Sequence, residues 1–287
     1  MKFACHLAFG PVDHMVPMAR AVEESGFDSV ALSDHVVHPE KIHTPYPYTD
    51  DGSLRWEPFT DWPDPWVSVG AMAAVTERVR FVTSVYVLPM RNPFVVAKAV
   101  GTAAAISRDR VTLGIGTGWM EDEFQLLEQP FRRRGKRTDE MIDILRKLWA
   151  GGMVEHHGEF YDFDRLEMSP APERPVPIIV GGLSDRALRR AATIGDGWIS
   201  DLHTTEELRG YLAKLRAFRA DSPRANEPMT VMVSCLDAFD RDAYAELEGI
   251  GATHVLTKPW VFYHGECEND LAAKIDGVKR FADDQIR

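Results

Sequence analysis

The chain has 287 residues, of which 45% are hydrophobic, and its formal net charge is −11 at pH 7. This length and composition are typical of a globular protein with a large core, and a single α/β barrel commonly reaches this size. The acidic balance disfavours nucleic acids and anionic membranes as partners, and the longest apolar runs are too short to span a bilayer.

Strand character begins at Lys2 with no positively charged leader before it, so the sequence shows no secretory signal. Cys5, Cys235 and Cys267 are far apart and odd in number, which favours neither a disulfide framework nor a zinc cluster. We therefore expect a cytoplasmic protein without a metal site.

Apolar, strand-like runs alternate with segments of helical spacing along the chain. We predict eight strands, over residues 2–9, 28–33, 80–87, 111–116, 177–181, 197–200, 229–235 and 253–257. The first helix begins around Val16, and Gly26 is placed to end it in a left-handed conformation. Later helices are predicted near 67–77, 93–106, 136–149, 185–194, 204–219, 242–248 and 268–283, with Asn92, Ser184 and Thr204 as helix starts. Such repeated units predict a closed (β/α)8 TIM barrel formed by one domain, residues 1–287, although a doubly wound sheet remains an alternative.

Two segments interrupt the alternation. Residues 36–66 form a long insert after the second strand, rich in proline and in aromatic residues such as Trp56 and Trp62. Aromatic side chains favour burial, so we expect an ordered lid rather than a disordered loop. Residues 153–164 are predicted to form a small hairpin before the fifth strand.

Small or polar residues alternate with bulky ones toward several predicted strand ends. Alternation along a strand places one set on the inner face of the barrel, and the carboxyl ends of barrel strands build the active site. The inward sets are Ala4, His6, Ala8 and Gly10; Ser29, Ala31, Ser33 and His35; and Thr112, Gly114, Gly116 and Gly118. They predict a flat slot for a large planar ligand at the barrel mouth. The alternative is that these small residues merely offset bulky ones elsewhere in the barrel.

His35 lies at the predicted rim, beside Asp34. An imidazole suits proton transfer near neutral pH, and Asp34 could orient the ring. The alternative is a structural histidine that caps the loop. A metal site is less favoured: His35 and His38 are three residues apart, but the later pair His156–His157 lies on the predicted hairpin with no evident acidic partner.

Residues 181–185, Gly-Gly-Leu-Ser-Asp, follow the fifth strand and begin a helix. The free N–H groups at such a helix start, with glycines that allow close approach, are typical of a phosphate site, whereas simple capping by Ser184 is the alternative. Gly114 to Gly118 read GIGTG, but no acidic residue follows at the spacing of a dinucleotide fingerprint.

A basic run, residues 132–137, lies at the start of a predicted helix. We expect it to form salt bridges with nearby acids or, alternatively, to receive an anionic ligand group. The candidate acids are Glu121, Asp122, Glu123, Asp139 and Glu140. Trp260, Phe262 and Tyr263, after the eighth strand, could line a substrate pocket or pack the lid.

Several of these motifs, in this order, resemble those of the luciferase-like flavin and deazaflavin oxidoreductases, and look closest to the branch that uses coenzyme F420, an 8-hydroxy-5-deazaflavin. The resemblance spans almost the whole chain and is loosest across 36–66 and after the seventh strand. It rests on Ser33-Asp34-His35, Thr83-Ser84-Val85 with residues 88–93, residues 110–119, Gly181-Gly182 and residues 195–198.

The resemblance implies a barrel that holds the flat cofactor at the carboxyl ends of its strands, with a non-prolyl cis peptide at Ser84–Val85 against the ring. Asp34 and His35 would lie near the reactive ring. From their places in the insert and after the eighth strand, we expect Trp56 and Trp260 beside the substrate. The implied cofactor contacts are Ser84, Val85, Gly116, Thr117, Gly118, Trp119, Gly181, Gly182, Leu183 and Ser184, and the anionic oligoglutamate tail of F420 would suit the basic run. Trp119 stands where sugar-phosphate dehydrogenases of this branch carry a glutamate, which disfavours a sugar phosphate substrate.

From these features we expect an F420-dependent oxidoreductase that transfers a hydride to or from an apolar organic substrate, with His35 as proton donor or acceptor. An FMN-dependent monooxygenase on the same scaffold is the second reading, and a non-catalytic flavin-binding protein is the third. Relatives suggest a homodimer.

Overall fold

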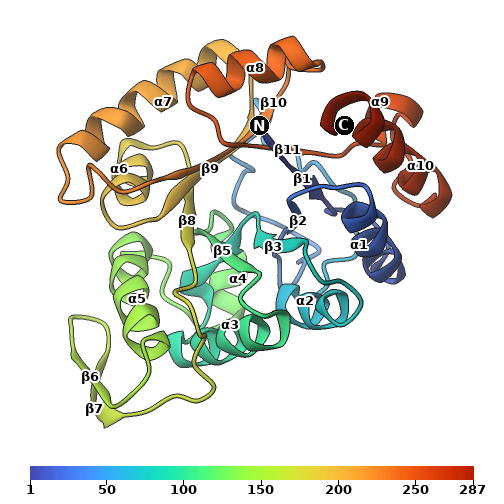
Figure 1. Ribbon diagram of the computed structural model, residues 1–287. Helices are drawn as coiled ribbons and strands as arrows, with labels where there is room; N and C mark the ends of the chain where they lie inside the picture. Colours follow the sequence, from blue (N-terminus) through green and yellow to red (C-terminus); the bar gives the residue numbers. More distant parts are fainter.

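Eight parallel strands close into a barrel in the computed structural model, which describes residues 1–287 (Figure 1). The strands follow the order β3-β2-β1-β11-β10-β9-β8-β5, and pairing of β3 with β5 completes the circle. The predicted TIM barrel is thereby confirmed. The strands are β1 (Lys2–His6), β2 (Ser29–Leu32), β3 (Arg80–Thr83), β5 (Val111–Gly116), β8 (Ile178–Gly181), β9 (Gly197–His203), β10 (Thr230–Cys235) and β11 (His254–Thr257).

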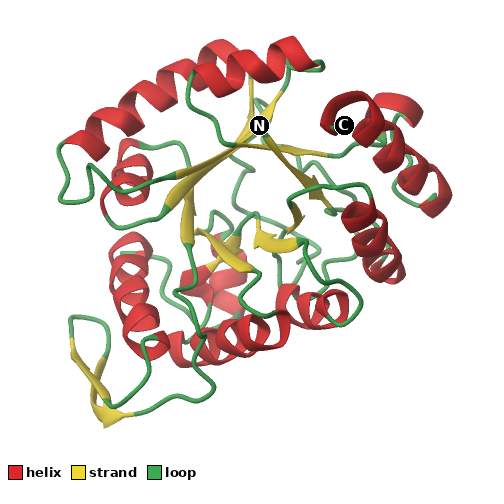
Figure 2. Cartoon of the chain, in the orientation of Figure 1, coloured by secondary structure: helices red, strands yellow, loops and turns green.

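Helices surround the barrel and cover the outer faces of its strands (Figure 2). Asn92, Ser184 and Thr204 each cap a helix through a side-chain oxygen, as predicted, and Gly26 has a positive φ of 85° just after the first helix. No helix combines the length and apolar character that a membrane crossing needs. The helices are α1 (Met15–Glu24), α2 (Pro65–Ala73), α3 (Pro93–Ser107), α4 (Glu121–Leu126), α5 (Arg134–Trp149), α6 (Asp185–Thr193), α7 (Thr205–Ala220), α8 (Arg241–Gly249), α9 (Val261–His264) and α10 (Leu271–Phe281).

The predicted third strand, 80–87, is interrupted in the structure. A cis peptide bond joins Ser84 to Val85, and a separate two-residue strand, β4 (Tyr86–Val87), pairs with the end of β5. The first strand ends at His6, so Ala8 and Gly10 lie beyond it rather than on its inner face. The short helices α4 and α9 were not predicted, because neither is long enough to show a helical period.

The hairpin and the insert fall where they were expected. Strands β6 (Val154–His157) and β7 (Asp162–Leu166) pair antiparallel and project from the ring of helices (Figure 1). The insert forms no strand or helix before α2 begins at Pro65. Within it Trp56 is buried, whereas Phe59 is fully exposed.

The barrel interior confirms the predicted alternation on the strands. A buried cluster separate from the outer core contains one inward side chain from each of seven strands, Ala4, Ala31, Val82, Ile179, Ile199, Met232 and Leu256, with Val85 packed against it. The outward residues Val30, Leu32, Val111, Leu113 and Ile115 belong to the outer core beneath the helices. This inner cluster fills the barrel below its carboxyl end, so a ligand must enter above it.

Candidate active site at the barrel mouth

His35 follows the carboxyl end of β2, and its ring is held by Glu123, an acid that we expected to pair with the basic run. His35 Nδ1 lies 2.7 Å from Glu123 Oε2, a carboxylate that is almost fully buried on α4. The other oxygen of Glu123 accepts the N–H groups of Val36, at 2.7 Å, and Val37, at 3.2 Å. Burial raises the pKa of the Glu123 carboxyl, but these hydrogen bonds outweigh burial, so the pKa lies below its usual value.

Asp34 does not orient His35, contrary to the expectation from sequence. Its buried carboxylate forms two hydrogen bonds with the guanidinium of Arg91, at 2.6 and 2.7 Å, and accepts the N–H of Val87 at 2.9 Å. Asp34 and His35 both follow the end of β2 at Leu32 and take different partners, so Asp34 contacts the segment before α3 whereas His35 contacts α4. Asp34 therefore anchors the 84–91 segment to β2.

Aromatic rings of the insert, together with Trp119 after β5, surround His35. The ring centroid of His35 lies 5.0 Å from that of Trp56, 4.7 Å from that of Trp62 and 6.1 Å from that of Trp119. The ring of Tyr46 contacts both Trp56 and Trp119, with centroid distances of 5.4 and 5.1 Å. The insert thus brings an apolar wall to the imidazole, as expected of a lid.

The glycines at the strand ends make room for protein side chains, whereas we expected them to leave space for a ligand. A Cβ atom on Gly116 would lie 2.7 Å from Val85, and one on Gly181 would lie 2.9 Å from the same side chain. A Cβ on Gly118 would meet Val87 and Phe124 at 2.6 and 2.7 Å. These glycines therefore admit the 85–87 segment, and the hollow they were expected to leave is partly filled by Val85.

The loop after β8 keeps the features of an anion site. Gly182 has a φ of 113°, and Gly181, Gly182 and Leu183 are half-buried at the rim. The hydroxyl of Ser184 accepts the N–H of Ala187 at 3.2 Å, so Ser184 caps α6. The first N–H groups of a helix have no partner within it, and those of α6 point toward this rim.

The salt bridges expected between the basic run and the acids near it are wrong. Arg133 pairs with Glu159, whereas Arg134 and Arg137 donate to the carbonyl oxygens of Gly118 and Pro89, at 2.9 and 2.7 Å. Glu123 and Asp122 instead hold the insert, and Asp139 pairs with Arg190. Arginine is a multiple donor, so it can satisfy buried carbonyl groups at chain turns as readily as carboxylates.

The later histidine pair does have acidic partners, contrary to expectation. His156 Nε2 lies 3.2 Å from Glu140 Oε1, and Glu140 also accepts the N–H groups of Phe160 and Tyr161. This contact joins the hairpin to α5. Across the chain, no group of three or more His, Cys, Asp or Glu side chains has the arrangement of a metal site.

Trp260 lies in the outer core, not in an open pocket. Its side chain has no exposed surface, and a Cβ on Gly277 of α10 would lie 2.3 Å from the Trp260 Cα. The ammonium of Lys274 is 4.8 Å from the ring centroid. Trp260 therefore packs α10 onto the barrel, and Trp56 is the better candidate for substrate contact.

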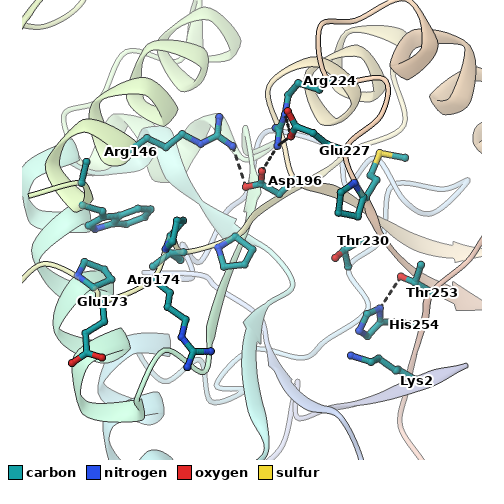
Figure 3. A pocket seen from close by; sticks show the side chains of 18 of the residues that line it. Lys2, Arg146, Glu173, Arg174, Asp196, Arg224, Glu227, Thr230, Thr253 and His254 are labelled. Carbon is teal, nitrogen blue, oxygen red and sulfur yellow. Dashed lines mark hydrogen bonds and ion pairs between the residues drawn. The ribbon is translucent and has the colours of Figure 1, made fainter.

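A cavity of about 1200 Å³ opens at the opposite end of the barrel (Figure 3). It is lined by residues at strand starts, among them Lys2, Thr230 and His254. Asp196 lies between Arg146 and Arg224 in its wall, at 3.0 and 2.6 Å. The Asp196 carboxylate is therefore shared between two guanidinium groups in the wall of this cavity.

Comparison with known proteins places these observations in context. The sequence profile of the family described as luciferase-like monooxygenase matches residues 4–266. An uncharacterized protein of Mycobacterium tuberculosis is 37% identical over 287 residues, covering 100% of this chain and 99% of that protein. An F420-dependent glucose-6-phosphate dehydrogenase of Nakamurella multipartita is 35% identical over 200 residues, covering 67% of this chain and 52% of that enzyme. Among solved structures, the monooxygenase RslO1 of Streptomyces bottropensis superposes with a TM-score of 0.78 at 18% identity, over 100% of this chain and 99% of that chain.

Proposed function

Because the chain belongs to the luciferase-like monooxygenase family, we propose that it transfers a hydride between coenzyme F420 and an uncharged organic substrate at the barrel mouth. The family relationship makes the chain a luciferase-like oxidoreductase that uses a flavin or deazaflavin. The choice of F420 is the proposal. It is supported by the 35% identity with an F420-dependent dehydrogenase and by His35, a histidine near the barrel mouth whose ring contacts Glu123.

The residues at the mouth fit such a cofactor. Val85 stands out from the barrel wall at the cis peptide, half-buried, where one face of a flat ring could rest. The start of α6, with its glycine pair, would hold the cofactor's phosphate. The exposed Arg132 and Lys136 remain candidates for the anionic tail of F420.

A bound deazaflavin would supply two-electron hydride chemistry rather than oxygen activation, because carbon replaces the reactive ring nitrogen of flavin. The chain itself must move a proton. The ionised Glu123 accepts a hydrogen bond from Nδ1–H of His35, which leaves Nε2 to give a proton to a substrate oxygen or to take one from it. The aromatic wall excludes water from that exchange.

The His35–Glu123 pair carries the proposal. The His35 side chain is 11% exposed, contacts a nearly buried carboxylate and lies among three indole rings. An ionisable group in such apolar surroundings is typical of a functional site. The same apolar wall favours an uncharged substrate over a sugar phosphate.

The decisive experiment is titration of the purified protein with F420 and, separately, with FMN, following ring fluorescence. We expect F420 to bind at least about tenfold more tightly, which corresponds to about 1.4 kcal/mol. Tighter binding of FMN, together with oxygen consumption in the presence of reduced FMN, would instead establish the FMN-dependent monooxygenase. Tight F420 binding without turnover of any alcohol or ketone would establish a binding protein.

A further inference from the structure

His6, the last residue of β1, is a second histidine at the barrel mouth, and the site described above does not use it. Ala4 belongs to the inner cluster, so His6, two residues later, shares the inward face of β1. His6 Nε2 lies 2.8 Å from Ser33 Oγ, and Ser33 Oγ lies 3.1 Å from the carbonyl oxygen of Ser84. A hydrogen-bonded chain therefore links β1, the end of β2 and the cis peptide.

This chain of contacts fixes which ring nitrogen of His6 carries the proton. The Ser84 carbonyl oxygen can only accept, so the single proton of the Ser33 hydroxyl is directed to it. Ser33 Oγ must then accept from His6, which means that Nε2 carries the hydrogen. The remaining nitrogen, Nδ1, keeps its lone pair.

The surroundings of His6 keep the ring neutral. Burial, together with the nearby Lys258 ammonium, lowers the pKa of His6 to about 3. Lys258 itself is held 2.5 Å from Glu268 at the rim. His6 Nδ1 makes no hydrogen bond within the protein, and the residue is half-buried, whereas Nδ1 of His14 is fully buried.

We propose that His6 is a ligand-binding residue whose Nδ1 accepts a hydrogen bond from an uncharged N–H or O–H group of the molecule at the barrel mouth, with Ser33 as the residue that sets its tautomer. The proposal rests on the proposed function only in assuming that a flavin-like cofactor and its substrate occupy this mouth.

The chemistry of Nδ1 limits the ligand groups that His6 can bind to hydrogen-bond donors. A neutral, acceptor-only nitrogen binds a donor group and offers nothing to a carboxylate or phosphate. Two sources carry such a donor, the imide N–H of the cofactor ring and the hydroxyl of an alcohol substrate. With so low a basicity His6 binds but does not remove a proton, which distinguishes its role from that of His35.

The tautomer is tested directly by nitrogen-15 NMR of histidine side chains in the free protein. We expect His6 to give the neutral Nε2–H pattern from pH 5 to pH 8 and, on addition of F420, of FMN or of 2-propanol with F420, a shift of the Nδ1 signal. An Nδ1–H tautomer or an imidazolium at pH 7 would overturn the proposal whether or not any cofactor binds. If neither cofactor binds the wild-type protein, the proposed function fails while the tautomer assignment is still tested.

Two substitutions separate binding from structure. His6→Gln places an amide near Nε2 and keeps the bond to Ser33 but removes the Nδ1 acceptor, whereas His6→Asn keeps an acceptor oxygen near Nδ1. We expect H6Q to weaken the affected ligand about tenfold, as for one lost hydrogen bond, and H6N to restore most of that loss. His157→Gln, on the exposed hairpin, is the matched control.

The titrations also identify the source of the donor. Weaker F420 binding by H6Q assigns the cofactor N–H, and a higher KM for 2-propanol at unchanged F420 affinity assigns the substrate hydroxyl. Equal affinities and KM values in H6Q and wild type would overturn the proposal. Melting temperatures of all variants show whether the fold is retained, and Ser33→Ala, which leaves the His6 ring in place, should reproduce part of the H6Q effect.

Discussion

Two adjacent residues, Asp34 and His35, show how one strand end serves both structure and chemistry. The Asp34 carboxylate is buried and accepts hydrogen bonds from Arg91 and from the Val87 N–H, so it holds the loop that carries the cis peptide. His35 instead contacts a different carboxylate, that of Glu123 on α4. The two side chains thus have separate hydrogen-bonding partners, Arg91 for Asp34 and Glu123 for His35.

This division predicts different outcomes for substitutions at His35 and Glu123. His35→Ala removes the proton carrier and should lower kcat by about 100-fold, while F420 affinity changes by less than about threefold. Glu123→Gln keeps a hydrogen-bonding side chain but loses the charge, and should lower kcat by about tenfold, the equivalent of one charge-assisted hydrogen bond. Steady-state kinetics and cofactor titration measure both, and unchanged turnover in H35A would remove His35 from the mechanism.

The pH dependence of stability gives a second readout for Glu123. Its pKa in the folded protein is lowered, so its contribution to the free energy of unfolding is complete above its ordinary value of about 4.3 and is lost as the pH falls through the lowered pKa. The melting temperature of the wild type should therefore fall more steeply than that of E123Q below about pH 4. Parallel acid limbs would mean that Glu123 gains nothing from ionisation in the fold.

At the scale of elements, the sequence predicted best those segments whose hydrophobic residues repeat with the period of a strand or a helix. Strands and long helices carry a periodicity of two or of about 3.6 residues, so the barrel and its inward sets could be predicted. The partner of His35 could not, because Glu123 is one of three consecutive acids and lies 88 positions away. The glycines of β5 and β8 were correctly placed at the mouth, but the sequence did not show that Val85 would occupy the space beside them.

The insert likewise has no period, and what holds it down is visible only in three dimensions. Arg55 donates from one nitrogen to both oxygens of Asp201 on β9, at 2.9 Å each, and from another to the carbonyl oxygen of Tyr48 at 2.6 Å. This contact reaches across the mouth from the insert after β2 to the opposite side of the barrel. Other anchors, such as Thr44 on Asp122, lie on the α4 side.

We therefore expect the Arg55–Asp201 ion pair to stabilise the closed position of the insert over the barrel mouth. The pair is about one-quarter exposed, so its loss should cost roughly 0.5 kcal/mol and shift lid opening about twofold. Arg55→Ala and Asp201→Asn should both speed hydrogen exchange across residues 44–56, as should high salt in the wild type. Arg20→Ala, an exposed arginine on α1, is the control, and exchange rates equal to those of the wild type would show that aromatic packing alone holds the lid.

At the scale of the molecule, two neighbouring helices have an unusual surface. Helix α2 contains no charged residue and α3 contains only Lys98. Their outer faces nevertheless expose Val67 at 75%, Val95 at 65% and Ile106 at 55%. A helix that is apolar on all sides is normally buried, so we expect another protein surface to cover α2 and α3.

We propose that a second copy of the chain provides this cover, with α2 and α3 of two protomers packed against each other. A symmetric pairing needs one self-complementary patch, and a patch without charge meets that requirement with no opposing ion pairs. Val67→Glu or Val95→Glu would bury unpaired carboxylates at the contact, so either should convert a dimer into a monomer in size-exclusion chromatography with light scattering. Met153→Glu, which is equally conspicuous on the hairpin at 57% exposure, should leave the mass unchanged. A monomeric wild type at high micromolar concentration would contradict the pairing and leave the apolar face of α2 and α3 to a different partner.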